Sequence, residues 1–178
     1  RQRARDARAD NAGAGWDDDV FSRIKGVKTA FTGYNEDSCT ATIIAMAKNN
    51  EEIGQANEGD EAVIVTDKTV FYGESGGQVG DTGRMLSDLV NIEIVNTKKA
   101  ADGKYLHYGI VKSGSVKTGD TLTLEIDTQN RLATERNHSS THLLQKALRM
   151  TLGDHVEQSG SYVSSERLRF DFTHFSAM

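Results

Sequence analysis

Two histidines, His138 and His142, lie four residues apart where the sequence takes up a helical pattern. On a helix, residues at this spacing share one face, with Cβ atoms about 5–6 Å apart. Both imidazoles can therefore point at one zinc ion, which binds histidine nitrogen at about 2.0–2.1 Å. The same spacing also fits two ordinary histidines on an amphipathic helix. Spacing alone leaves both a zinc site and a metal-free helix face open.

A glycine-rich stretch at 71–83 is the second candidate, with five glycines in the eleven residues from Gly73 to Gly83. Glycine at this density permits positive φ and the close approach of another backbone or a ligand. A phosphate-binding loop needs a lysine, then serine or threonine, and then a helix. That order is missing here, which excludes a nucleotide loop. The composition favours a structural loop between strands over one that contacts substrate.

The elements that position these residues begin with short runs rich in valine, isoleucine, threonine and aromatic residues, separated by glycine, aspartate and asparagine. This texture is typical of antiparallel β structure. Leu122, Leu124 and Ile126 alternate with polar residues, as a half-buried strand requires. About six strands predict a small barrel or sandwich. The expected strands are 38–47, 61–66, 69–72, 91–97, 105–112 and 121–127.

From Gln129 the spacing of apolar residues changes from every second residue to that of a helix. The pattern predicts a helix over 131–152 that ends at Gly153. Two strands are expected after it, near 156–163 and 168–173. A sheet normally needs at least three strands to be stable alone, so this last part looks truncated. The residues expected to face a core are Leu132, Leu143, Leu144, Ala147 and Leu148.

The fold class predicted is therefore α+β, a small antiparallel β-barrel followed by a truncated α+β domain. We expect a helical lead-in at 1–28, the barrel at 29–128 and the partial domain at 129–178. The chain begins at Arg1 rather than at a methionine, and we expect it to be a piece of a longer protein.

Charge and composition narrow the function classes. Residues 17–128 carry 11 basic and 19 acidic side chains, a net charge of −8, which disfavours the barrel as an autonomous RNA binder. No apolar run approaches the roughly 18 residues of a membrane span. A single cysteine, Cys39, excludes an intramolecular disulfide and fits a reducing compartment, so we expect a cytoplasmic location.

Three stretches, 71–83, 137–144 and 168–174, together resemble the linker barrel and editing domain of bacterial-type alanyl-tRNA synthetases. Their order, spacing and content agree over about 100 residues. The arginine-rich lead-in resembles the end of the tRNA-recognition helices of that family. One departure is Val70, where the family often has a proline, and this affects only a local turn.

The resemblance implies proofreading: hydrolysis of the ester bond of mischarged Ser-tRNA(Ala) or Gly-tRNA(Ala). It implies that His138 and His142 are zinc ligands and that Thr141 and Gln158 line the editing pocket. It also implies that ATP and magnesium belong to an aminoacylation domain absent from this chain. The expected partners are tRNA(Ala) and the remainder of the synthetase chain, with no membrane.

The family completes its zinc site with a Cys-x-x-x-His pair farther along, and no such pair occurs in these 178 residues. We therefore expect an incomplete zinc site and a fragment that does not deacylate tRNA by itself. His155 or His174 could serve as a substitute ligand, but each is more simply interpreted as a solvent-facing or core-edge histidine. The alternatives are a non-catalytic module that positions tRNA or connects domains, and a free-standing aminoacyl-tRNA deacylase.

Overall fold

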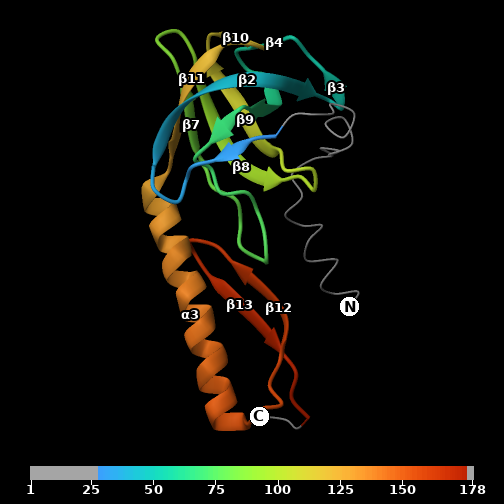
Figure 1. Cartoon of the computed structure of the whole chain (residues 1–178), viewed down its shortest axis with the longest axis vertical. Helices are drawn as coiled ribbons and strands as arrows, with labels where there is room; N and C mark the ends of the chain where they lie inside the picture. Colours follow the sequence, from blue (N-terminus) through green and yellow to red (C-terminus); the bar gives the residue numbers. More distant parts are fainter. Residues whose placement is uncertain (1–27, 176–178) are drawn as a thin grey trace.

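The computed structural model describes residues 28–175, in which a set of strands is followed by one long helix and a hairpin (Figure 1). The strands are β1 (Ala30–Phe31), β2 (Ser38–Lys48), β3 (Glu51–Glu52), β4 (Gln55–Asn57), β5 (Glu61–Thr66), β6 (Lys68–Thr69), β7 (Gly83–Leu86), β8 (Asn91–Lys99), β9 (Tyr105–Ser113), β10 (Ser115–Lys117), β11 (Thr121–Ile126), β12 (Gln158–Val163) and β13 (Leu168–Phe172). The helix is α3 (Thr128–Leu152). Apart from Lys28, the expected lead-in lies outside the described residues.

Six antiparallel strands form a closed barrel, in the order β11-β7-β8-β9-β5-β2, and β11 pairs back with β2 to close it. The predicted alternation in β11 is confirmed, because Leu122, Leu124 and Ile126 are buried while Thr121 and Glu125 are exposed. The interior is filled mainly by aliphatic side chains and methionine. The largest of these are Ile43, Met46, Ile64, Met85, Ile92, Ile94 and Leu124. Burial of this apolar surface is the main source of stability for the barrel.

The predicted strand 69–72 is wrong beyond its first residue. Only Lys68–Thr69 forms a strand, which pairs in parallel with β1. The next backbone groups bond to side chains instead: Phe71 N–H donates to Thr69 Oγ1 and Tyr72 N–H to Asp81 Oδ2. Strand β7 was not predicted, because four residues beginning with glycine carry no alternating pattern.

Helix α3 begins three residues earlier than expected, directly after the last barrel strand. The Asp127 side chain caps it by accepting from Asn130 N–H at 3.0 Å. At the other end, Gly153 N–H donates to Arg149 O at 3.0 Å, as the glycine stop predicts. The β12–β13 hairpin then runs back along the helix (Figure 1).

The expectation that the leucines of this helix face a core is wrong for most of them. Leu132, Leu143 and Leu144 are 43%, 72% and 37% exposed, and Ala147 is exposed as well. Leu148 is half-buried, and Thr134 is the one buried residue of α3. A two-stranded hairpin covers too little of the helix to bury its apolar side chains.

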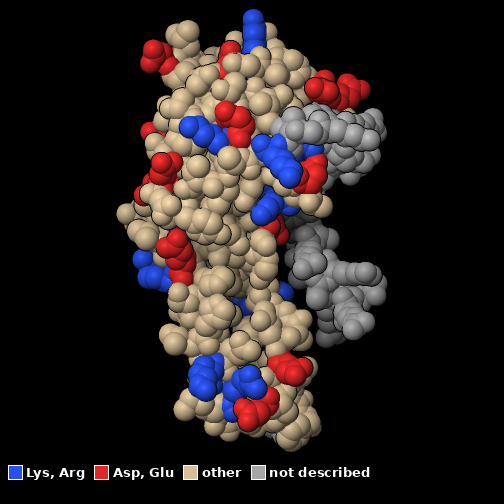
Figure 2. All heavy atoms as spheres, viewed as in Figure 1, with Lys and Arg blue, Asp and Glu red and all other residues tan. Residues whose placement is uncertain are grey.

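The surface carries mixed charge. Figure 2 shows basic and acidic side chains interspersed over the face in view, so that face presents no field of a single sign. Among residues 28–175, no helix combines the length and apolar composition needed to cross a membrane.

Candidate functional site

The two histidines of α3 lie side by side. His142 Nε2 is 3.2 Å from His138 Nε2, and the ring centroids are 5.0 Å apart. Two nitrogens held by one tetrahedral zinc ion at 2.0–2.1 Å would lie about 3.3 Å from each other. The observed separation therefore fits two imidazoles that share an ion.

Two imidazoles alone fall short of the three or four protein ligands that zinc usually takes. Within residues 28–175 no group of three or more histidine, cysteine, aspartate and glutamate side chains is poised to hold a metal. Cys39 lies in the barrel interior, where burial raises the pKa of its thiol and so disfavours the thiolate that zinc requires. The fit to zinc thus extends to His138 and His142 and to no further described ligand.

Gln78, from the glycine-rich stretch, contacts the first histidine directly: its Oε1 atom lies 2.8 Å from His138 Nδ1. A tight turn presents this side chain. Gly76 and Gly77 have φ of 59° and 87°, and Ser75 and Gln78 on either side exchange two backbone hydrogen bonds. Positive φ at both central positions is the mark of a type I′ hairpin turn, which glycine makes without strain.

Backbone hydrogen bonds join the same turn to the β12–β13 hairpin, which lies beside α3. Val163 N–H donates to Gly77 O at 2.8 Å, and Val79 N–H donates to Val163 O at 3.0 Å. A Cβ atom at Gly77 would lie 2.4 Å from Ser161 O, so only glycine permits this approach. The glycine-rich stretch is thus more than a connection between barrel strands, because it joins the barrel to the hairpin and reaches His138.

An ion pair fixes the start of α3 on the barrel. The Arg131 guanidinium donates from Nε and Nη2 to Asp81, and it also donates to the carbonyl oxygens of Gly33 and Val70, at 3.0 and 2.9 Å. Burial disfavours the charged guanidinium, but hydrogen bonding and charge from Asp81 outweigh it and raise the pKa of Arg131. The helix that carries the histidines is therefore held by the loop that carries Gln78.

The other two predicted pocket residues are placed differently. Thr141 lies on α3 between the histidines, and its hydroxyl donates to Asn137 O at 2.9 Å. Gln158 is exposed at the start of β12, where it pairs with Phe172. At about 3.3 Å per residue, it lies roughly 16 Å along the strand from Val163. Thr141 therefore lies next to His142 on the helix. Gln158 lies at the open end of the hairpin, away from the turn that joins its two strands.

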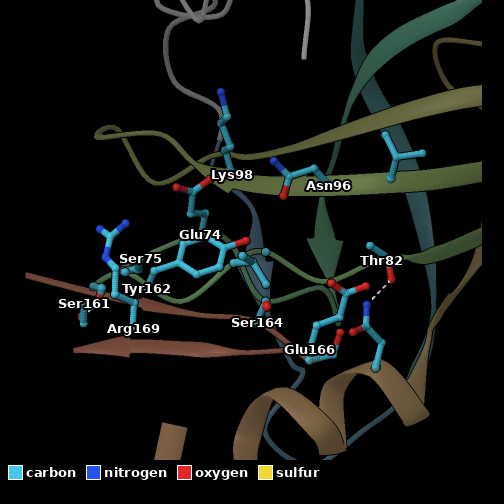
Figure 3. Close-up of a pocket in the computed structure, with 17 residues that line it drawn as sticks. Glu74, Ser75, Thr82, Asn96, Lys98, Ser161, Tyr162, Ser164, Glu166 and Arg169 are labelled. Carbon is cyan, nitrogen blue, oxygen red and sulfur yellow. Dashed lines mark hydrogen bonds between the residues drawn. The ribbon is translucent and has the colours of Figure 1, made fainter. Parts of the chain in front are cut away.

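Two grooves flank the glycine-rich turn. One, of about 810 Å³, is lined by His138, Ser139, Gln78 and Arg131 together with residues of the barrel. The other, of about 780 Å³, lies between the turn, β8 and the hairpin (Figure 3). Figure 3 shows Tyr162 beneath Glu74 in this second groove. At its side, Asn130 Nδ2 donates a hydrogen bond to Thr82 Oγ1 at 2.9 Å. The first groove is the one that reaches His138.

The remaining histidines have other partners. His107 is fully buried, and its ring lies 2.8 Å from Thr69 Oγ1 and 2.9 Å from Ile64 O. Burial lowers the pKa of His107 to about 4, partly opposed by the Ile64 carbonyl. His155 Nε2 lies 2.8 Å from His174 Nδ1, so these two pair with each other.

Sequence reasoning missed Gln78 and Arg131 as parts of the site. The signal for Gln78 was its place directly after two glycines, which marks an exposed turn that another element can approach. Arg131 carried no signal of its own, because its partner Asp81 lies in a different predicted domain.

Comparison with known proteins gives consistent results. The model of the family described as tRNA synthetases class II (A) matches residues 1–130. The chain is 46% identical to the alanine–tRNA ligase of Acetivibrio thermocellus over 98% of this chain and 20% of the relative. It is also 46% identical to the alanine–tRNA ligase of Clostridioides difficile, over 100% of this chain and 20% of the relative. The chain is 48% identical to the alanine–tRNA ligase of Desulfosudis oleivorans, over 86% of this chain and 18% of the relative. The chain spans about a fifth of the length of these curated relatives.

Proposed function

Because the chain belongs to the class II (A) family of tRNA synthetases, we propose that it forms the barrel and part of the editing region of an alanine–tRNA ligase. The reaction assigned to this region is hydrolysis of the ester bond in Ser-tRNA(Ala) and Gly-tRNA(Ala). The observation that carries the proposal is the separation of 3.2 Å between the Nε2 atoms of His138 and His142.

Editing answers a difficulty in selecting alanine. Serine differs from alanine by one hydroxyl and glycine by one methyl group. Differences this small limit discrimination at a synthetic site to factors of about ten to a few hundred. A second site that binds the serine hydroxyl rejects alanine, because its polar groups would then be left unpaired. Hydrolysis at such a site removes the wrong amino acid after it has been attached.

Each proposed residue has a distinct role. His138 and His142 hold zinc, which when bound supplies a Lewis acid that orients or polarises the aminoacyl group. Thr141 already donates its proton to Asn137 O, so its oxygen is left to accept a hydrogen bond from the serine hydroxyl. Gln158 binds the substrate or the attacking water, an assignment that rests on the family resemblance alone.

The rest of the reaction belongs to parts of the ligase beyond this chain. On this proposal ATP and magnesium act in the aminoacylation domain, and the protein works in the cytoplasm. Its partners there are tRNA(Ala) and the remaining domains of the ligase. Further zinc ligands come from outside the described residues.

A second candidate, a module that positions tRNA or connects domains without chemistry, is favoured by one observation. The described residues offer two metal ligands, and catalytic zinc usually has three plus water. The two candidates predict different results when the further zinc ligands are supplied: the editing site then hydrolyses mischarged tRNA, and the non-catalytic module does not.

A chimera supplies it: this chain replaces the matching segment of the Acetivibrio thermocellus relative. We expect the chimera to hydrolyse Ser-tRNA(Ala), and His138→Ala and His142→Ala each to lower that rate at least about 100-fold, as loss of a positioned catalytic group does. Aminoacylation with alanine should stay unchanged and serves as the control for folding. A chimera that charges tRNA(Ala) but hydrolyses neither Ser-tRNA(Ala) nor Gly-tRNA(Ala) favours the second candidate.

Metal content gives an independent measurement. We expect near-stoichiometric zinc in the chimera and little in the chain alone, because two ligands bind zinc weakly. Equal zinc in both would show that the chain holds a complete site. Robust hydrolysis of Ser-tRNA(Ala) by the chain alone would lead to the same conclusion.

A further inference from the structure

We propose that Gln78 is a positioning residue that selects the tautomer of His138 in which Nε2 is free to bind metal. The inference rests on the proposed function, since it concerns the same pair of histidines. It assigns a role in the site to the glycine-rich turn of the barrel, which lies far from the helix in sequence.

The contact is made by the ring nitrogen that faces away from the partner histidine. Gln78 Oε1 is 2.8 Å from His138 Nδ1, whereas His138 Nε2 faces His142 Nε2. An amide oxygen only accepts hydrogen bonds, so Nδ1 must carry the proton. A neutral imidazole has one N–H, which leaves the lone pair of Nε2 directed at the position that a shared ion would take.

Gln78 is held well enough to impose this choice. Its residue is only 8% exposed, and two backbone bonds with Ser75 fix the turn that presents it. The bonds between Val163 and the residues on either side of Gln78 then fasten the turn to the hairpin. A partner on a rigid element holds a ring in one orientation at little entropic cost.

The separation between the two histidines agrees with the same tautomer. At 3.2 Å, His138 Nε2 can accept a hydrogen bond from His142 Nε2–H in the absence of metal. If the Gln78 amide were reversed, its NH₂ group would donate to Nδ1 and the proton of His138 would move to Nε2. The proton would then block the metal-binding atom. The two amide orientations therefore predict opposite tautomers.

Nitrogen NMR of the 178-residue chain at pH 8 measures the tautomer directly. We expect His138 to carry its proton on Nδ1, and Gln78→Leu to shift it largely to Nε2. Gln78→Glu should keep the Nδ1–H form, since a carboxylate oxygen also accepts the bond. Gln55→Leu, an exposed position on β4, is the matched control and should change nothing. An Nε2–H tautomer in the unsubstituted chain, or one unchanged by Gln78→Leu, would overturn the inference.

Zinc affinity of the chimera gives the second readout, by competition with a chelator. Loss of a partner that orients a ligand typically weakens metal binding about 10–100-fold, and we expect this for Gln78→Leu. Gln78→Glu should restore the affinity to within about threefold of the original, as the retained hydrogen bond requires. If Gln78→Leu binds zinc as tightly as the unsubstituted chimera, the positioning role is wrong while the proposed function stands. If the unsubstituted chimera neither binds zinc nor hydrolyses Ser-tRNA(Ala), the proposed function fails, and the NMR result alone judges the contact between Gln78 and His138.

Discussion

Arg131 of α3 and Asp81 of the glycine-rich stretch form a largely buried ion pair at the junction between the barrel and the helix. The guanidinium meets both carboxylate oxygens and also bonds two barrel carbonyls. The pair therefore sets how the histidine-bearing helix leaves the barrel.

Arg131→Leu should lower the free energy of unfolding by about 3–5 kcal/mol, because it leaves the Asp81 carboxylate buried without its partner. Urea unfolding of the chain measures this. Lys112→Leu is the matched control, since Lys112 pairs with Glu93 at 2.9 Å with both side chains about half exposed. Such an exposed pair contributes about 0–1 kcal/mol. Equal losses for the two variants would contradict the role of Arg131 at the junction.

His107 should make stability fall as the pH is lowered from 7 to 5. Its pKa is about 4 in the folded chain and 6.5 when unperturbed, so between these values the unfolded state binds the proton and the folded state does not. At pH 5 the loss due to this residue should be about 2 kcal/mol. Well below pH 4 both states are protonated and the contribution of His107 changes no further.

His107→Gln isolates this effect, since glutamine does not titrate. The variant loses stability at neutral pH because the imidazole hydrogen bonds are disturbed. From pH 7 to pH 5, the unfolding free energy of His107→Gln should nevertheless fall by about 2 kcal/mol less than that of the original chain. An unchanged pH dependence would show that other groups cause the decline.

Two adjacent glycines should respond differently to alanine. Both have positive φ, which costs about 1–2 kcal/mol for a residue with a Cβ atom. The space around Gly76 is open, whereas a Cβ at Gly77 would meet Ser161 O at 2.4 Å. We expect Gly76→Ala to cost about 1–2 kcal/mol and Gly77→Ala about 3 kcal/mol or more.

Amide exchange of Val163 separates strain from undocking of the turn, because this N–H donates to Gly77 O. Exchange should accelerate in Gly77→Ala, relative to the global change in stability, and stay in proportion to it in Gly76→Ala. Similar exchange in the two variants would contradict the close approach of the turn to the hairpin.

Much of the barrel followed from alternation in the sequence. The strand Glu61–Thr66 agrees with its prediction at both ends, and the glycine stop of α3 at Gly153 was also predicted. The exposure of Leu143 was not predictable, because an apolar helix pattern shows that a face can be buried and not what covers it. The two glycines before Gln78 mark a turn, but its contact with His138 could not be predicted, since it depends on pairing between this turn and a strand much farther along the chain.

The closure of the barrel also determines the order in which the site can assemble. Strand β2 pairs with β11, so that Ser38 meets Glu125 from the other end of the barrel sequence. Contacts of such high contact order form slowly, because a long loop must close before they stabilise the chain. Helix α3 follows β11 after a single residue, Asp127. During synthesis, the barrel must therefore wait for its last strand, and the contact between Gln78 and His138 can form only once that strand and the first turns of the helix have left the ribosome.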